Sequence, residues 1–313
     1  MKLATYEYRG VQRIGLADPA ANEMLDLAEA AGGRDLGAFH DMLSLIEAGA
    51  DAWALARECG EARPAGALLP LEDLRLLAPL PRPTQYRDCL TFELHLKNCM
   101  VQWEKMNGRP AQPIPDAWYE RPTWYKGNRM SFVGHDADVI WPPYSEKMDY
   151  ELELACVVGK RGKDIKREDA WDHVFGLTIL NDFSARDQQA VERPLGTGPM
   201  KTKDFDTGNV IGPWIVTLDE FADPGALDMS VSVNGKHMGG GNSRDMHHDF
   251  PAILSFMSQS ETLYPGELIG SGTVGTGCGL EFGRFLDPGD VIELKIEGIG
   301  SLRNRIVKSG GPA

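Results

Sequence analysis

Two glutamates, Glu151 and Glu153, lie inside a run of residues that is typical of a buried β-strand. Because side chains alternate between the two faces of a strand, both carboxylates would point to the same side and stand next to each other. Two negative charges about 4 Å apart repel each other by roughly 4 kcal/mol at an effective dielectric constant near 20. A folded protein can relieve this repulsion by protonating one carboxyl group or by binding a cation. The pair is therefore a candidate metal site.

A third carboxylate, that of Asp182, closes the apolar segment 175–180. Together with Glu151 and Glu153 it would supply an all-oxygen set of ligands, which suits Mg²⁺, Mn²⁺ or Ca²⁺. Zinc would more often recruit histidine or cysteine, and neither lies close by in the sequence. The three carboxylates therefore predict a site for a hard divalent cation.

Two other interpretations of these carboxylates stay open on spacing alone. Asp182 or Ser184 could cap a helix that follows the apolar segment. The strand with the two glutamates could instead be a surface strand, with Lys147 and Lys160 as ion-pair partners. Neither alternative would require a metal.

Further candidates for chemistry follow the proline-rich stretch 81–83. Asp88, Glu93 and His95 could among them supply a fourth metal ligand and a general base. A single histidine on a helix is more often structural, so both interpretations of His95 stay open. The adjacent His247 and His248 are expected at the surface, because neighbouring residues cannot easily share one ion.

Residues 270–275 match the pattern G-x-G-x-x-G. A dinucleotide-binding site needs a helix that begins at this loop. The sequence continues with Thr276-Gly277-Cys278-Gly279, which cannot start a stable helix. The pattern therefore predicts a glycine-rich loop between strands that could lie against a ligand.

The elements around these residues indicate two domains. Residues 1–18 predict a β-hairpin, and residues 35–58 carry the apolar spacing of a helix. We expect the prolines at 81–83 to link a small N-terminal α+β domain, residues 1–80, to a larger domain, residues 81–313.

The larger domain is rich in short apolar segments that Gly and Pro residues separate. Strands are predicted at 139–141, 150–158, 175–180, 214–217, 229–233, 267–270 and 291–296. Helices are predicted only at 167–174 and 250–260. We therefore expect an α+β fold that is mainly β, a mixed β-sandwich or roll, and not a doubly wound sheet.

The bulk composition is that of an ordinary globular protein. The 313-residue chain has 32 Lys and Arg against 46 Asp and Glu, a formal charge of −14, which argues against nucleic-acid binding and against docking to an anionic membrane. No apolar run is long enough to span a membrane, and the N-terminus lacks the apolar region of a signal peptide. The cysteines show no close pairing, and we expect reduced thiols in a cytoplasmic protein: Cys59, Cys89, Cys99, Cys156 and Cys278.

Taken together, the segments between residues 84 and 307 resemble the fumarylacetoacetate hydrolase family. The E-x-E run at 150–154 and the N-D-x-S-A-R-D run at 181–187 are its most specific motifs. The other matching pieces follow in the family's order: Asp88 to His95, Tyr125-Lys126-Gly127, Lys203 to Thr207, Gly212-Pro213-Trp214, Val233-Asn234-Gly235, Pro265-Gly266-Glu267 and Gly270 to Thr273. Residues 1–80 resemble the variable N-terminal part of many members.

The resemblance implies a fold, a cofactor and a class of substrate. The fold would be a mixed β-sandwich roll, with homodimers expected. The cofactor would be Mg²⁺, Mn²⁺ or Ca²⁺, and the partner a small 2-oxo or 2,4-diketo acid. The resemblance also assigns roles: metal ligands Asp88, Glu151, Glu153 and Asp182; the general base His95 with Glu281 orienting it; Arg186 and Lys203 at the developing negative charge; substrate contacts Tyr125, Gln189 and Thr273.

This assignment predicts a metal-dependent hydrolase that cleaves a carbon–carbon bond in an acylpyruvate-like 2,4-diketo acid, as fumarylacetoacetate and fumarylpyruvate hydrolases of aromatic catabolism do. The alternative is decarboxylation, tautomerisation, isomerisation or dehydration of a 2-oxo acid at the same site. A metal-dependent binding protein is disfavoured, because it would need no general base.

Three positions depart from the hydrolase pattern. Cys89-Leu90-Thr91 replaces an aromatic stretch, and Asn128 stands where an arginine would hold a second substrate carboxylate. Lys201 lies close to Lys203, which we prefer because it keeps the spacing to Gly212. These differences concern the substrate more than the metal.

Overall fold

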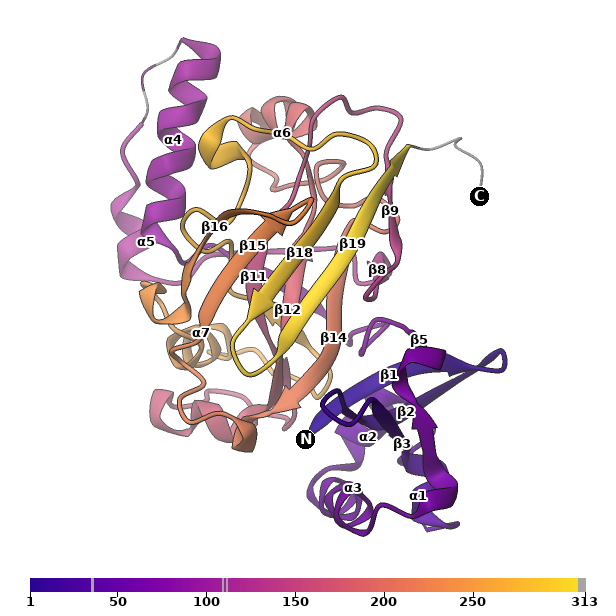
Figure 1. Cartoon of the computed structure of the whole chain (residues 1–313). Coiled ribbons are helices and arrows are strands. Elements are labelled where there is room, and N and C mark those ends of the chain that lie inside the picture. The colour runs from indigo at the N-terminus through magenta and orange to yellow at the C-terminus, as the bar shows by residue number, and fades with distance from the viewer. Residues whose placement is uncertain (35–36, 109, 111, 309–313) are drawn as a thin grey trace.

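The computed structural model describes residues 1–34, 37–108, 110 and 112–308 (Figure 1). The strands of its largest sheet are β1 (Lys2–Tyr8), β2 (Val11–Asp18), β3 (Glu23–Asp26), β4 (Leu68–Pro70), β5 (Arg75–Leu76), β6 (Tyr86–Cys89), β7 (Trp124–Lys126), β8 (Phe132–Val133), β11 (Leu152–Val158), β12 (Val174–Asp182), β14 (Asn209–Thr217) and β17 (Leu268–Gly270). Their spatial order is β4-β3-β2-β1-β14-β12-β11-β17-β6-β7, with β5 beside β1 and β8 beside β14.

A second sheet covers one face of the first. Its strands are β9 (Asp138–Trp141), β15 (Asp228–Val233), β16 (Lys236–Asn242), β18 (Val291–Ile296) and β19 (Gly300–Lys308). They run in the order β16-β15-β18-β19-β9, and a short pair joins β10 (Met148–Asp149) to β13 (Ser184–Ala185). Leu152 and Leu154 of β11 share one buried cluster with Leu294 and Ile296 of β18. The expected mainly β sandwich is therefore confirmed.

The opposite face of the first sheet packs against the N-terminal part of the chain. Ala155 and Val157 of β11 share a buried cluster with Leu45 and Ile46. The helices on this side are α1 (Leu27–Ala31), α2 (Met42–Ala48) and α3 (Ala50–Ala62). Figure 1 shows them below the sandwich, together with β1 to β5. The predicted hairpin over residues 1–18 is confirmed.

The helix predicted over residues 35–58 is wrong as one continuous element. Gly49 separates α2 from α3, and its φ of 78° is a conformation that no helix interior allows. Residues 35–36, where that prediction began, lie outside the described residues. The break turns the second helix in a new direction, so that both helices bury their apolar sides.

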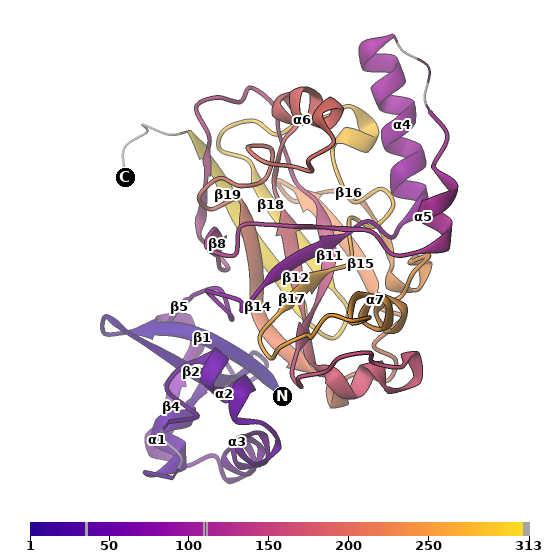
Figure 2. The same ribbon diagram turned by 180° about the vertical axis from the view of Figure 1, so that it is seen from behind.

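The remaining helices surround the sandwich. They are α4 (Glu93–Asn107), α5 (Asp116–Glu120), α6 (Arg186–Glu192) and α7 (Phe250–Met257), with short 3-10 turns η1 (Ala65–Ala67), η2 (Leu71–Asp73), η3 (Arg167–His173), η4 (Arg193–Leu195), η5 (Leu218–Glu220), η6 (Ser243–Asp245) and η7 (Leu280–Phe282). The helix expected at 167–174 is thus a 3-10 segment. Helix α4 stands along one side of the molecule, as Figures 1 and 2 both show.

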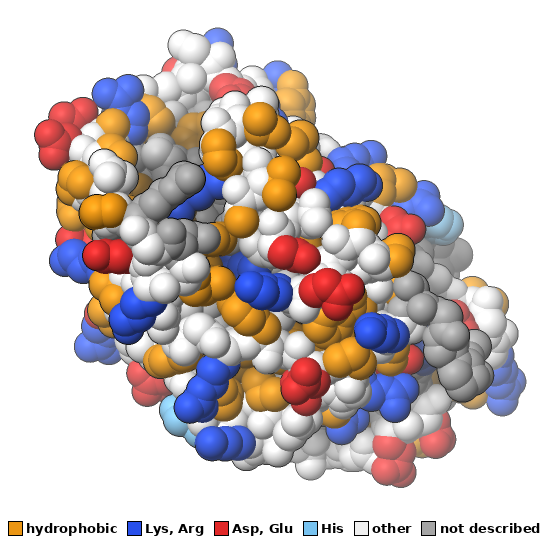
Figure 3. All heavy atoms as spheres, turned by 90° about the horizontal axis from the view of Figure 1, so that it is seen from above, with side chains coloured by type: hydrophobic (Ala, Val, Ile, Leu, Met, Phe, Trp, Pro, Cys, Tyr) orange, Lys and Arg blue, Asp and Glu red, His pale blue; other side chains and the backbone are white. Residues whose placement is uncertain are grey.

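None of the described helices is both long and apolar enough to cross a bilayer. Seen from above, acidic, basic and hydrophobic side chains of the described residues are interspersed over the visible face (Figure 3). All the cysteines are buried and unpaired, in agreement with the expectation of free thiols.

Candidate active site

Three carboxylates meet on one face of the large sheet. Glu153 lies in β11, Asp182 ends β12 and Asp88 lies in β6. Glu153 pairs with Leu180, and Asp88 pairs with Gly270 of the intervening strand β17. This register turns the three carboxylates the same way, and one oxygen of each lies within 4.8 Å of the others. We call Asp88, Glu153 and Asp182 the carboxylate cup.

Gly270 makes room for this cup. A Cβ atom at position 270 would lie 2.2 Å from Asp88 Oδ1, closer than real contacts allow, and 3.0 Å from Glu153 Oε2, which is tighter than most. Because β17 lies between β11 and β6, any side chain on this face would fill the space between the carboxylates. The glycine-rich loop thus starts where a carboxylate approaches the backbone. No helix begins at this loop, as the sequence predicted.

The electrostatics of the cup favour a cation. Burial and the Asp182 charge raise the pKa of Asp88 to about 8, and burial with the neighbouring Asp88 carboxyl raises the pKa of Glu153 well above its usual range. Burial also raises the pKa of Asp182. Asp88 Oδ1 and Asp182 Oδ1 are buried and accept no hydrogen bond from the described residues. An all-oxygen set with two unpartnered oxygens fits Mg²⁺, Mn²⁺ or Ca²⁺.

Glu151 is turned toward two cationic side chains. Its carboxylate accepts a hydrogen bond from Arg186 Nη2 at 2.7 Å and another from Lys203 Nζ, which also binds Asp182. Burial opposes ionisation of Glu151, but Lys203 and Arg186 hold its pKa well below the usual value. The structure therefore places Glu151 beside the cup, and its role as one of four metal ligands stays a prediction.

The two alternatives that needed no metal do not hold. Glu153 has no exposed surface and Glu151 is 6% exposed, so their strand is not a surface strand, and the partners of Glu151 are not the lysines expected. Helix α6 has Ala185 at its N-cap position and no side-chain cap, so neither Asp182 nor Ser184 caps it.

Arg186 is fixed by a group that sequence reasoning missed. Asp149 Oδ2 accepts a hydrogen bond from Arg186 Nε at 2.8 Å, and Gln189 Oε1 accepts one from Nη1 at 3.1 Å. Asp149 lies two residues before Glu151 in the same acidic segment. This position was the only feature of the sequence that could have pointed to Asp149 as a site residue. Lys203 is buried whereas Lys201 is exposed, which favours Lys203 as the site residue.

Tyr125 and Thr273 contact the cup directly. The Tyr125 hydroxyl donates a hydrogen bond to Asp182 Oδ2 at 2.7 Å, and Thr273 Oγ1 donates one to Glu153 Oε1 at 3.3 Å. The Gly272 amide donates to the other oxygen of Glu153 at 3.0 Å. The side chains of Tyr125 and Thr273 also line the cavity, so they can orient the carboxylates and contact a substrate.

His95 lies near the first turn of α4 and points to Glu281 of η7. Its Nδ1 lies 3.0 Å from Glu281 Oε1. The other oxygen of Glu281 accepts hydrogen bonds from Asn98 Nδ2 and from the Thr276 amide, each at 2.7 Å. Burial lowers the pKa of His95, but the adjacent Cys278 sulfur and Glu281 carboxylate raise it more, to about 10. Asn98, three residues after His95, was not predicted.

One cavity of about 410 Å³ brings these groups together. The predicted site residues that line it are Asp88, His95, Tyr125, Glu151, Glu153, Arg186, Gln189, Lys203 and Thr273. Asp182 and Glu281 lie just behind this lining, bonded to Tyr125 and His95. His247 and His248 lie outside it. Their rings pack on Trp118, and each is within hydrogen-bond distance of a backbone carbonyl, so the pair is structural.

Comparison with known proteins identifies the family of the chain. Residues 86–307 match the family model "Fumarylacetoacetate (FAA) hydrolase C-terminal". The chain belongs to the fumarylacetoacetate hydrolase family. The matched range begins at β6 and ends in β19, so it leaves out β1 to β5 of the large sheet but contains the strands that carry the cup and every predicted site residue.

Two curated relatives are identical to this chain at about a third of the aligned positions. The human mitochondrial protein named oxaloacetate tautomerase FAHD2A is 35% identical over 241 residues, which is 77% of this chain and 72% of the relative. The Bacillus subtilis protein named oxaloacetate tautomerase YisK is 34% identical over 75% of this chain and 74% of its own length.

Solved structures of the family superpose on nearly the whole chain. A fumarylacetoacetate hydrolase from Exiguobacterium antarcticum gives a TM-score of 0.76 at 28% identity, covering 98% of this chain and 99% of its own. A maleylpyruvate hydrolase from Sphingobium, solved with manganese(II) and pyruvate, gives 0.75 at 27% identity over 98% and 99%. These matches establish that the chain has the fold of the family and is one of its enzymes. The homodimer, the cytoplasmic location and the division at residue 80 stay predictions.

Proposed function

We propose that this enzyme catalyses a proton transfer at the carbon next to the keto group of a 2-oxo acid, as a metal-dependent tautomerase or isomerase. The observation that carries the proposal is the pairing of the carboxylate cup with the His95–Glu281 dyad in one cavity. Oxaloacetate is the first substrate to test, because the two relatives that are about a third identical over the aligned segment bear the name oxaloacetate tautomerase. The proposal therefore takes up tautomerisation or isomerisation, the alternative that the sequence left open, in place of the hydrolysis that it predicted first.

The cup would hold a divalent ion, Mg²⁺ by preference, through Asp88, Glu153 and Asp182, with Glu151 beside them. When bound, the ion would act as a Lewis acid on the oxygens of the 2-oxo acid. Lys203, which bonds to Asp182 and Glu151, would balance the negative charge of the carboxylates and of the enolate form. Substitution of each of these residues can test its proposed role.

Arg186 and Gln189 would hold the carboxylate of the substrate. Arg186 is buried, lines the cavity and is kept in place by Asp149, so its guanidinium is pre-oriented for an anion. Gln189 and Arg193 line the same cavity. A dicarboxylate could therefore be held at both ends, although Asn128 does not supply the expected arginine.

His95 would move the proton. With a pKa of about 10 it carries its proton at neutral pH, and Glu281 stabilises the charged imidazolium. It would give this proton to the double-bond carbon of the enol that does not carry the hydroxyl group. That carbon then lies next to the new keto group. The proton of the enol hydroxyl would leave to solvent in the cavity, from which the imidazole would be recharged. A proton transfer of this kind typically contributes about 10² to 10⁴-fold to the rate.

Hydrolysis is the second candidate. Once the imidazole has lost its proton, the His95–Glu281 pair could also activate water for attack on the distal carbonyl of an acylpyruvate. Solved relatives of that activity, a fumarylacetoacetate hydrolase and a maleylpyruvate hydrolase, superpose on the whole chain. Hydrolysis differs from tautomerisation because it breaks a carbon–carbon bond and yields two organic acids.

A product assay separates the two candidates. The purified protein is incubated with Mg²⁺ and either enol-oxaloacetate or an acylpyruvate, and the products are identified by mass. We expect rapid loss of the enol absorbance without cleavage, loss of the effect after EDTA treatment, and recovery on adding Mg²⁺ or Mn²⁺. Two organic acids from the acylpyruvate would favour hydrolysis, and released CO₂ would favour decarboxylation. Full activity in EDTA-treated protein would refute the metal site.

A further inference from the structure

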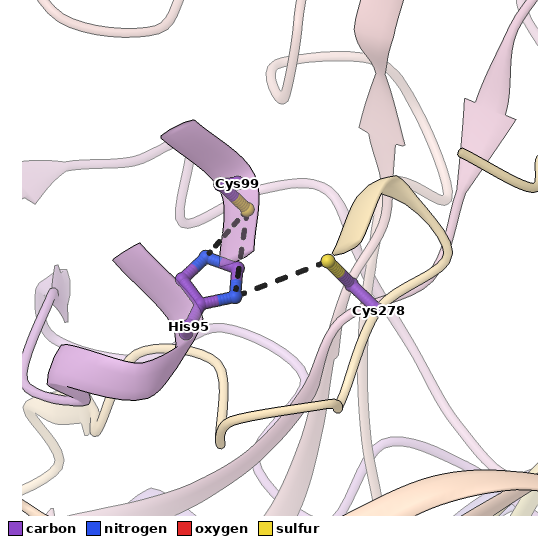
Figure 4. A group of neighbouring side chains, drawn as sticks. All are labelled: His95, Cys99 and Cys278. Atoms are coloured by element: carbon purple, nitrogen blue, oxygen red, sulfur yellow. Dashed lines mark hydrogen bonds between the residues drawn. The ribbon is translucent and has the colours of Figure 1, made fainter. Parts of the chain in front are cut away.

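A second cluster of metal-binding side chains adjoins the carboxylate cup. His95, Cys99 and Cys278 are all buried, and one ligand atom of each lies within 4.8 Å of the others. Figure 4 shows the imidazole between the two sulfurs. His95 and Cys99 are four residues apart on α4 and so share one side of the helix, while Cys278 comes from the loop before η7. The reaction proposed above does not use the cysteines.

The distances are close to those that a tetrahedral ion would need. His95 Nδ1 lies 3.8 Å from Cys99 Sγ and 3.9 Å from Cys278 Sγ. A tetrahedral zinc ion with Zn–N near 2.05 Å and Zn–S near 2.3 Å holds its nitrogen and sulfur ligands about 3.5 Å apart. Glu281 Oε1, 3.0 Å from Nδ1 and 3.7 Å from Cys278 Sγ, is placed to complete the set. Cys99 Sγ is equally close to His95 Nε2, at 3.7 Å, so it lies over the ring, and its side chain must rotate toward Nδ1 for the ion to bind.

The surroundings favour a soft ion over a hard one. Leu280 joins the two cysteines in a small apolar cluster, and Trp103 and Phe285 pack against it. Thiolate and imidazole ligands select ions of the zinc class, whereas the all-oxygen cup selects Mg²⁺, Mn²⁺ or Ca²⁺. His95 and Cys99 line the cavity, so an ion can reach them by the path that the substrate would take.

We propose that His95, Cys99 and Cys278 form a second metal site, for a thiophilic divalent ion such as Zn²⁺ or Cd²⁺, separate from the carboxylate cup. Each thiol, and Nδ1 of the protonated imidazole, gives its proton to solvent as the ion binds. Binding at His95 Nδ1 replaces the hydrogen bond to Glu281. The site would therefore switch the enzyme off when such an ion is present, a consequence that rests on the proposed role of His95.

Cadmium tests the site without relying on activity, because cadmium–thiolate bonds absorb in the near ultraviolet. The full-length protein, saturated with Mg²⁺, is titrated with Cd²⁺ and its absorbance is followed. We expect one equivalent to produce the thiolate band, which excess Mg²⁺ does not remove. Absence of the band from the wild-type protein overturns the proposal, and this result does not depend on any variant folding.

Variants locate the ion. Cys99→Ser and Cys278→Ser, checked for folding by thermal unfolding, should each weaken Cd²⁺ binding by more than about 100-fold, beyond what loss of an outer-shell partner costs. Cys59→Ser, the same change at a buried cysteine of α3, should bind as wild type does. Glu153→Gln, which damages the cup, should keep the band. Unchanged affinity in both cysteine variants, or loss of the band in Glu153→Gln, would refute the site.

Inhibition is measured against each variant's own cadmium-free rate. Cys278→Ser should tolerate at least about 100 times more Cd²⁺ than wild type before half its activity is lost, matching the change in affinity. Cadmium binding with no effect on activity would keep the site and refute the switch. A protein that binds cadmium but shows no activity on any 2-oxo acid would refute the proposed function and leave the site standing.

Discussion

At the scale of residues, the site divides its carboxylates into two kinds. Glu151 has two cationic partners and stays ionised, whereas Asp88 and Glu153 share a buried space without one and hold their protons. The E-x-E motif therefore places Glu151 with the cationic side chains and Glu153 in the carboxylate cup, where we propose that the metal binds. Two residues of the same type receive different roles because Arg186 and Lys203 reach only the first.

Metal affinity should rise with pH. The pKa of Asp88 is about 8 in the metal-free protein against about 3.9 in an unfolded chain, so its proton must leave before a cation binds. Mg²⁺ binding measured by calorimetry should strengthen as the pH rises from 6 to 9 and release protons. The same raised pKa makes the metal-free protein lose stability over this range, because the folded state binds the proton more tightly.

Thermal unfolding provides the check and its control. The increase in melting temperature on adding Mg²⁺ should be larger at pH 9 than at pH 6. Asp88→Asn removes the titrating group, so its residual metal binding should depend less on pH. Affinity that does not change between pH 6 and pH 9 would contradict a protonated cup.

His95 should be needed for the reaction and not for binding the hard metal. His95→Gln removes the titratable imidazole and should lower the rate by about 10² to 10⁴-fold, while calorimetry shows nearly unchanged Mg²⁺ affinity. Glu281→Gln, which keeps the size of the partner, should lower the rate less and shift the pH profile. Parallel loss of turnover and Mg²⁺ binding in His95→Gln would instead make the residue structural.

At the scale of elements, short strand β17 has the most consequence for the site. It separates β11 from β6, and its last residue, Gly270, leaves space that two carboxylates enter from either side. Helix α4 contributes in another way, because spacing of three and four residues sets His95, Asn98 and Cys99 on one side of it. Strand and helix thus bring different groups to the same cavity.

Gly270→Ala should damage the metal site. Its methyl group would meet Asp88 Oδ1 at 2.2 Å, so the carboxylates must move apart. We expect Mg²⁺ affinity to fall by at least tenfold with a modest loss of stability. Gly66→Ala is the matched control, since nothing lies within 4 Å of its Cβ and the residue is exposed. Wild-type affinity in Gly270→Ala would show that the cup tolerates a wider spacing.

At the scale of the whole molecule, the N-terminal part shares a sheet with the catalytic part. Strand β1 pairs with β14 at Leu3 and Ile215, and both side chains belong to the buried cluster that also covers β11. The Met1 amino group donates a hydrogen bond to Glu220 at 2.8 Å. The N-terminal hairpin is thus continuous with the strands that carry the cup.

Leu3→Ala should destabilise the protein as one unit. The side chain is fully buried, and such truncations cost about 2–5 kcal/mol of unfolding free energy. Denaturant unfolding should remain a single transition with a lower midpoint. Val11→Ala, at a side chain that is 53% exposed, should change the free energy by less than about 0.5 kcal/mol. Two separate transitions would show that the N-terminal part unfolds alone.

The sequence by itself determined the features that follow from local pattern. Alternation along a strand put Glu151 and Glu153 on one face, and the absence of a helix former after residue 275 excluded a dinucleotide loop. The ordered motifs identified the family and the residues that line the cavity. Where the chain departs from local pattern, as at Gly49, the break between helices was not predicted.

Only the tertiary structure decided which of these residues meet. His95 and Glu281 are 186 residues apart, and no periodicity links them. The same holds for Asp149 behind Arg186, for Cys278 beside His95, and for Gly270 between two carboxylates. Contacts between distant segments depend on sheet order and helix placement, which local spacing does not encode. The sequence therefore indicates which residue types can do the chemistry of the site. The fold determines that Glu151 pairs with cationic side chains, whereas Asp88 and Glu153 have raised pKa values.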